Sequence, residues 1–157
     1  MAKIIELTSP NGWPASEDRK AIGIQSFAIP GTSLKIACAK DVAPILVAFC
    51  KEFDEFVEPI DKGQLDDWGY AFRMTRGSDK VLSNHSSGTA VDLNALKHPL
   101  GKSNTFTKDQ TNTIQLLLVK YGLAWGGNYK RRKDEMHFEI AINKGQVQNK
   151  IKELGLK

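Results

Sequence analysis

The chain has 157 residues, and its 22 lysines and arginines exceed its 18 aspartates and glutamates, which gives a net charge of +4. Hydrophobic residues make up 41% of it and charged residues 25%. These proportions are typical of a folded protein and exclude disordered, collagen-like and disulfide-scaffold classes. A chain of this length predicts one domain over residues 1–157.

The N-terminal segment lacks the apolar run of about 7–15 residues that a secretory signal needs. Apolar runs elsewhere are far shorter than the roughly 20 residues of a membrane span. We therefore expect no signal peptide, no membrane insertion and a cytoplasmic location until the protein is released. Cys38 and Cys50 stand in no CxxC pair, so free buried thiols are predicted.

The excess positive charge lies in residues 128–157, which hold eight cationic and four anionic side chains. Its densest part is Lys130-Arg131-Arg132-Lys133. Such a run can bind nucleic acid, a membrane surface or an anionic polymer such as a cell wall, or it can be a solvated turn. Because no signature of a nucleic-acid-binding fold accompanies it, we expect no nucleic-acid partner.

Periodic apolar residues predict helices in three regions. Residues 41–60 show steps of three and four, with Asp41 as a candidate N-cap and Pro44 in the first turn. A second helix is expected over 108–121, because Thr107 and Gln110 have the spacing of a capping box and Gly122 supplies a stop. A short helix is predicted near 146–154.

Strand-like segments lie between the helices, each bounded by Gly, Asn or Asp. They are residues 34–39, 70–75, 89–94, 123–125 and 136–142. Because strands and helices do not alternate regularly, a doubly wound parallel sheet is disfavoured. The expected fold class is α+β, a small antiparallel sheet flanked by helices.

A first polar cluster occupies residues 83–94. If 89–94 is a strand, Asp92 shares one face with Ala90 and Asn94, while the alternate residues face the core. Gly88 allows a tight turn that brings His85 of the preceding segment toward Asp92. An imidazole nitrogen and a carboxylate oxygen are both acceptable ligands of zinc.

A second cluster follows at residues 133–140. Strand alternation places Met136, Phe138 and Ile140 inward and His137 with Glu139 on the opposite face. His137 is then a third ligand, and three protein ligands with one open position describe a catalytic zinc site.

The attacking water needs a base, for which Asp134 and Glu135 are both candidates. By contrast, His98 is next to a proline and has no acidic neighbour close in sequence. It is interpreted as a surface loop residue. The HExxH signature of helical zinc proteases is absent.

The string Ser83-x-His85-x-x-Gly88-x-Ala90-x-Asp92, followed by Asp134-x-x-His137, resembles the SxHxxGxxxD and [D/E]xxH motifs of one peptidase family. This is the zinc D-Ala-D-Ala carboxypeptidase family, which also contains phage L-alanyl-D-glutamate endopeptidases. The resemblance extends over roughly residues 11–142, since the segments 11–14 and 73–77 are also similar to the phage members.

The resemblance implies one zinc ion bound by His85, Asp92 and His137. It also implies that Asp134 takes the proton from the attacking water, although strict strand alternation would place Glu135 beside His137. We favour Asp134 in a turn before the strand and keep Glu135 as the alternative.

Among the remaining candidates, the resemblance implies that Arg73 stabilises the oxyanion and Arg76 grips a substrate carboxylate, or the reverse. Ser83 is expected to bind either the substrate or the loop of His85. The implied fold is hedgehog/DD-peptidase-like, a single zinc peptidase domain over 1–157 without a separate cell-wall-binding module.

The implied function is hydrolysis of the peptide stem of peptidoglycan. A phage endolysin that cleaves the L-alanyl-D-glutamate bond is the first expectation, and it would stay as a monomer in the cytoplasm of the infected host cell until its release to the cell wall. The alternatives are a D-Ala-D-Ala carboxypeptidase and, from another class, a non-catalytic zinc-containing binding module.

Overall fold

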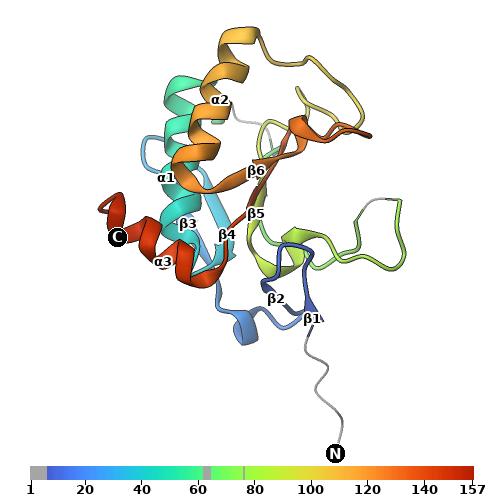
Figure 1. The fold of residues 1–157 in the computed structure, drawn as a ribbon, viewed down its shortest axis with the longest axis vertical. Helices are drawn as coiled ribbons and strands as arrows, with labels where there is room; N and C mark the ends of the chain where they lie inside the picture. Colours follow the sequence, from blue (N-terminus) through green and yellow to red (C-terminus); the bar gives the residue numbers. More distant parts are fainter. Residues whose placement is uncertain (1–6, 62–64, 76) are drawn as a thin grey trace, which may run out of the picture.

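A computed structural model describes residues 7–61, 65–75 and 77–157 of the chain. The helices α1 (Ala43–Phe56), α2 (Lys108–Tyr121) and α3 (Lys144–Glu153) lie together on one side of the strands β5 (Ala90–Asp92), β6 (Leu123–Trp125) and β7 (His137–Ile140) in Figure 1. The segments that precede β5 and β7 extend to the other side. The predicted class, α+β with antiparallel pairing, is confirmed.

The central sheet consists of β5 (Ala90–Asp92), β7 (His137–Ile140) and β6 (Leu123–Trp125), antiparallel and in that order. The alternation predicted for residues 136–142 holds within β7. Phe138 and Ile140 are fully buried on the helix side, while His137 and Glu139 face the other way. Met136 lies ahead of β7; it is buried, as predicted, and it also lines a cavity on the side of His137.

Aromatic packing joins α1 to the sheet. The ring centroid of Phe138 lies 4.9 Å from that of Phe49 and 5.6 Å from that of Phe53. The periodic apolar face predicted for this helix therefore packs in the hydrophobic core. The helix begins after the N-cap Val42, and Asp41, the predicted cap, instead lies 3.8 Å from Lys144. The predicted cap was wrong.

The other two helices begin with capping boxes. Thr107 and Gln110 cap α2 reciprocally, and Gly122 ends it with φ 68°, as predicted. In α3 the pair is Asn143 and Gln146, so this helix starts two residues before the predicted 146. The same signal that located α2 was thus present in the sequence of α3 and was missed.

The N-terminal part forms hairpins that the sequence analysis largely missed. β1 (Leu7–Thr8) pairs with β2 (Pro14–Ala15), and β3 (Ile24–Ala28) pairs with β4 (Lys35–Ala39). Only β4 was predicted, within 34–39. The 3-10 helices are η1 (Arg19–Ile22), η2 (Asn84–Ser87) and η3 (Gly126–Asn128).

The strand predicted over residues 70–75 is wrong, because these residues form no strand in the structure. Isolated bridges join Trp68 to Asp92 and Met74 to Leu82. Between them the backbone N–H groups bond elsewhere: that of Tyr70 donates to Ala37, and that of Arg73 donates to the hydroxyl of Ser86. This segment therefore contacts β4 and η2 through isolated hydrogen bonds and forms no strand of its own.

Cys38 and Cys50 are buried and unpaired, as predicted, and burial raises the pKa of both thiols. Among the described residues, none of the helices has the length and apolar character needed to cross a membrane.

Candidate metal centre

His85 is presented by the 3-10 turn η2, immediately before β5. The hydroxyl of Ser83 accepts a hydrogen bond from the backbone N–H of His85 and caps the turn. Gly88 ends it with φ 69°, and a Cβ at this position would lie only 2.3 Å from Ile24 Cδ1 and 2.7 Å from the nitrogen of Ala39. Only glycine fits here, so the tight turn expected at Gly88 is confirmed.

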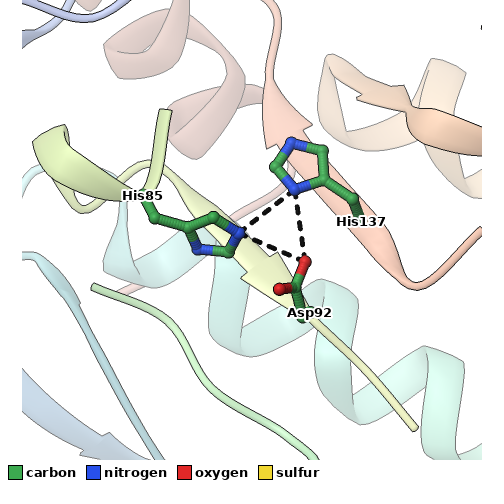
Figure 2. Close-up of side chains that lie close together, drawn as sticks. All are labelled: His85, Asp92 and His137. Atoms are coloured by element: carbon green, nitrogen blue, oxygen red, sulfur yellow. Dashed lines mark hydrogen bonds and ion pairs between the residues drawn. The ribbon is translucent and has the colours of Figure 1, made fainter. Parts of the chain in front are cut away.

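The other two members of the cluster come from the sheet. Asp92 at the end of β5 and His137 at the start of β7 are direct register partners. Figure 2 shows the three side chains turned toward one another. His85 Nε2, His137 Nδ1 and Asp92 Oδ1 form a triangle in which each pair of atoms is 3.2 Å apart. The structure thus brings together the three residues that were predicted as ligands.

Each of the three side chains has a second partner on its outer side. The carbonyl oxygen of Gly69 lies 2.7 Å from His85 Nδ1, and Glu139 Oε1 lies 3.0 Å from His137 Nε2. The indole N–H of Trp68 donates to Asp92 Oδ2 at 2.8 Å. These partners fix the ring orientations and leave one atom of each side chain facing the centre of the triangle.

The outer partners also decide where the imidazole protons lie. A carbonyl oxygen only accepts, so His85 carries its proton on Nδ1, and His137 carries one on Nε2 toward the Glu139 carboxylate. In the neutral rings the remaining nitrogens present lone pairs toward each other and toward Asp92. Three acceptors within 3.2 Å repel one another unless a cation lies between them.

The spacing of the three atoms fits zinc. Two ligands of a tetrahedral zinc, each about 2.0–2.1 Å from the ion, are about 3.3–3.4 Å apart. The 3.2 Å edges of this triangle are close to that value. Two imidazole nitrogens and one carboxylate oxygen are donors that zinc accepts, and three protein ligands leave a position for a reacting group.

The charges around the triangle also favour a bound cation. Burial by itself raises the pKa of Asp92, but the imidazoles of His137 and His85 beside it hold that pKa well below its usual range. Burial lowers the pKa of His137, yet hydrogen bonds to Asp92 and Glu139 raise it to about 9. In the metal-free protein a proton on His137 therefore supplies the positive charge, and a metal ion would replace it.

The triangle lies in the wall of a cavity of about 650 Å³. The remaining walls come mainly from the loops before β5 and before β7, with Pro10 from the β1–β2 hairpin and Leu100 from the loop between β5 and α2. The lining residues are Pro10, Arg73, Thr75, Ser83, Asn84, His85, Asp92, Leu100, Tyr129, Lys130, Arg131, Arg132, Asp134, Met136, His137 and Glu139. A cavity of this size accommodates a short peptide segment.

The two candidate bases point in different directions. Asp134 precedes β7 in a loop, as predicted, and lines the cavity with the three cluster residues. Glu135 is buried, and its carboxylate accepts hydrogen bonds from the backbone N–H groups of Asn104 and Thr105. The geometry therefore favours Asp134 over Glu135.

The predicted substrate-contacting residues are placed as follows. Arg73 lines the cavity, with its Nη2 atom 4.0 Å from Asp92 Oδ2. Ser83 lines it too, but its hydroxyl is engaged with η2. Arg76 lies outside the described residues. Three residues of the basic run, Lys130 to Arg132, line the same cavity, which the sequence did not predict.

Two other predictions near the site were wrong. His98 is 1% exposed rather than on the surface, and its Nε2 lies 2.5 Å from Glu58 Oε1. Asn94 does not continue the face of β5, because its backbone turns to φ 49° and its amide donates to the same Glu58 oxygen. Both contacts were missed because their common partner, Glu58, lies far away in the sequence.

Further site residues carried no recognisable signal. Trp68 and Gly69 lie in no motif. Tyr129 donates from its hydroxyl to Glu139 at 2.7 Å, and Asn84 donates to the other oxygen of the same carboxylate. Glu139 was placed on the face of His137 by strand alternation, and that pattern was the one signal that could have revealed its role.

Comparison with known proteins gives one family match. Residues 76–140 match the family model described as D-alanyl-D-alanine carboxypeptidase. This segment holds all three cluster residues and Asp134, and the match supports a metallopeptidase. Among curated proteins and among solved structures, no significant match was found.

Proposed function

We propose that the protein is a zinc-dependent peptidase that hydrolyses the peptide stem of bacterial peptidoglycan. One observation carries this proposal: His85, Asp92 and His137 direct three acceptor atoms, 3.2 Å apart, toward a common centre at a cavity wall. The family match over 76–140 supports the reaction class.

In this proposal His85 Nε2, His137 Nδ1 and Asp92 Oδ1 hold the zinc ion. When bound, zinc polarises the peptide carbonyl and makes water a stronger nucleophile at neutral pH. Asp134 accepts the proton of the attacking water and delivers it to the leaving amine. Arg73 donates hydrogen bonds to the carbonyl oxygen as negative charge develops on it.

The basic side chains of the cavity fit a peptide rich in carboxylates, although Asp92, Asp134 and Glu139 also line it. Arg73 and the run Lys130 to Arg132 line it together with the metal ligands. Peptidoglycan stems carry free carboxylates beside their peptide bonds, and guanidinium groups bind carboxylates with paired hydrogen bonds. This complementarity supports the stem as the substrate.

We propose the L-alanyl-D-glutamate bond as the site of cleavage, and an endolysin as the biological role, from the resemblance of the motifs to the phage members of the family. The description of the matching family model favours the other candidate, a D-Ala-D-Ala carboxypeptidase. The same zinc, base and arginine would serve either bond.

Mass spectrometry of digested peptidoglycan distinguishes these activities. The zinc-loaded protein is incubated with purified peptidoglycan, with and without a chelator. A chelator-sensitive new amine on D-glutamate is the expected result. Release of D-alanine would assign the carboxypeptidase activity. Zinc binding without any cleavage would refute the peptidase and leave a non-catalytic zinc module.

A further inference from the structure

A buried chain of polar side chains lies behind the loop that carries Asp134. It starts at Glu58, just after α1, and continues through His98 and Thr105 to Glu135. His98 Nε2 lies 2.5 Å from Glu58 Oε1, and His98 Nδ1 lies 2.6 Å from the Thr105 hydroxyl. That hydroxyl lies 2.5 Å from Glu135 Oε1.

The proton positions along this chain follow from the chemistry of its ends. The hydroxyl of Thr105 donates to the Glu135 carboxylate, so its oxygen is left to accept the N–H of His98 Nδ1. The other ring nitrogen lies against Glu58. His98 thus connects Glu58 to Thr105, and the ring of Phe106 stacks on it at 3.7 Å between centroids.

Charged and polar groups also surround Glu58, at the start of the chain. Burial raises the pKa of Glu58, but hydrogen bonds from His98 and Asn94 bring it below its usual value, so Glu58 is ionised. Lys97 Nζ lies 4.0 Å from the second oxygen of Glu58. A buried chain in which every member has a partner is rigid, because losing one link leaves a buried polar group unsatisfied.

The loop 98–105, which contains His98 and Thr105 of this chain, bonds to the residues on both sides of Asp134. After it, the Glu135 carboxylate accepts from the backbone N–H groups of Asn104 and Thr105, each at 2.9 Å. Before it, the Lys133 carbonyl accepts from Gly101 at 2.8 Å. These hydrogen bonds fix the residues on either side of Asp134 to the loop 98–105.

The opposite side of the same turn is held by η3. The N–H of Asp134 donates to the Gly126 carbonyl at 3.1 Å. A Cβ at Gly126 would lie 2.1 Å from the Asp134 carbonyl oxygen, so the two backbones are in close contact. The backbone around Asp134 is therefore hydrogen-bonded to η3 on one side and to the loop 98–105 on the other.

We propose that His98 and Thr105 are positioning residues that, through Glu135, hold the Asp134 carboxylate where it serves as the base. This inference rests on the proposed peptidase function. It separates the neighbouring acids into distinct roles: Asp134 faces the cavity and handles the proton, while Glu135 faces the protein and fixes the turn. Displacement of a catalytic group by about 1 Å can cost about 100-fold in rate.

The test compares Thr105→Val, which keeps the shape and deletes the hydroxyl, with Thr105→Ser, which restores the hydroxyl. Thr113→Val is the matched control, because the hydroxyl of Thr113 donates to the Asp109 carbonyl within α2 and bonds to no other of the described residues. For each variant one measures zinc content, kcat and KM on a peptidoglycan stem peptide, and hydrogen exchange of the Asp134 and His137 amides.

We expect Thr105→Val to retain one zinc and a KM within about twofold of wild type, with kcat lower by at least about tenfold. Exchange of the two amides should be faster by on the order of tenfold. Thr105→Ser should restore kcat, and Thr113→Val should match wild type.

The proposal is overturned if Thr105→Val keeps the kcat and exchange of wild type, or if Thr105→Ser is no better than Thr105→Val. Failure of the proposed function is a separate result, namely a wild-type protein that binds zinc and cleaves no stem peptide.

Discussion

Asp92 and His137 are directly opposite residues of two antiparallel strands, with Asp92 Oδ1 3.2 Å from His137 Nδ1. The pairing register of β5 and β7 therefore sets the geometry of the metal centre. A slip of one residue would turn one of the two side chains to the opposite face of the sheet, where Phe138 packs against α1. The core that fixes the register thereby fixes the site.

Removal of one ligand should release the metal. We expect His85→Ala to bind zinc at least about 10-fold more weakly than wild type, because two ligands remain of three. Metal analysis after gel filtration measures the stoichiometry. His98→Gln is the matched histidine control and should keep one zinc. Equal zinc content in His85→Ala and wild type would contradict the assigned ligand.

The neighbouring acids should respond differently to loss of charge. Asp134→Asn should keep its zinc and its melting temperature and lose about 10²–10⁴-fold in kcat, because the base is gone. Glu135→Gln should lower the melting temperature, which Asp134→Asn leaves unchanged, since the Glu135 carboxylate accepts three hydrogen bonds. Normal turnover by Asp134→Asn would exclude Asp134 as the base.

Arg73 should matter for turnover more than for binding. Its guanidinium lies 4.0 Å from Asp92 at the cavity wall, where negative charge would develop on the carbonyl oxygen. We expect Arg73→Ala to lower kcat by about 10²–10³-fold. Arg76→Ala should raise KM and affect kcat less. Steady-state kinetics on a stem peptide measure kcat and KM of both variants. A larger loss of kcat in Arg76→Ala than in Arg73→Ala would exchange the two roles.

A carboxyl outside the site should make stability depend on pH. Burial raises the pKa of Asp67 to about 7, against the hydrogen bond from the Asn94 N–H, and the charge of Asp66 adds to the rise. The folded state therefore holds a proton that the unfolded state loses near pH 3.8, so stability falls as the pH rises from about 4 to 7.

Asp67→Asn removes this cost of ionisation. At pH 8 the variant should be more stable than wild type by about 1 kcal/mol, a value reduced for the partial exposure of the group. The gain should shrink toward pH 4, where Asp67 is largely protonated in both states. Thermal melts at the two pH values measure it, and a loss of stability at pH 8 would contradict the prediction.

Local signals in the sequence were sufficient for much of the site. The motif residues His85, Asp92 and His137 form the cluster, and the alternation in β7 places Glu139 beside His137. The capping box of α2 marked its start at the observed residue. Each of these features depends on residues close together in the chain, where spacing alone determines geometry.

Features that depend on distant partners could not be predicted. His98 seemed exposed because its partner Glu58 is 40 positions away. The segment around Tyr70 has the composition of a strand, but its N–H groups bond to β4 and η2 rather than to a sheet neighbour. Trp68 orients Asp92 through a hydrogen bond that no motif encodes. Such contacts arise from tertiary packing, which overrides local propensity.

The most direct test of the central claim is a zinc titration of the metal-stripped protein. Cleavage of a peptidoglycan stem peptide is followed as zinc is added, with His137→Ala measured in parallel. We predict that stripped wild type is inactive, that activity rises linearly to one equivalent of zinc, and that His137→Ala stays inactive throughout. Full activity without zinc, or equal recovery by His137→Ala, would contradict the assignment of His85, Asp92 and His137 as the catalytic metal site.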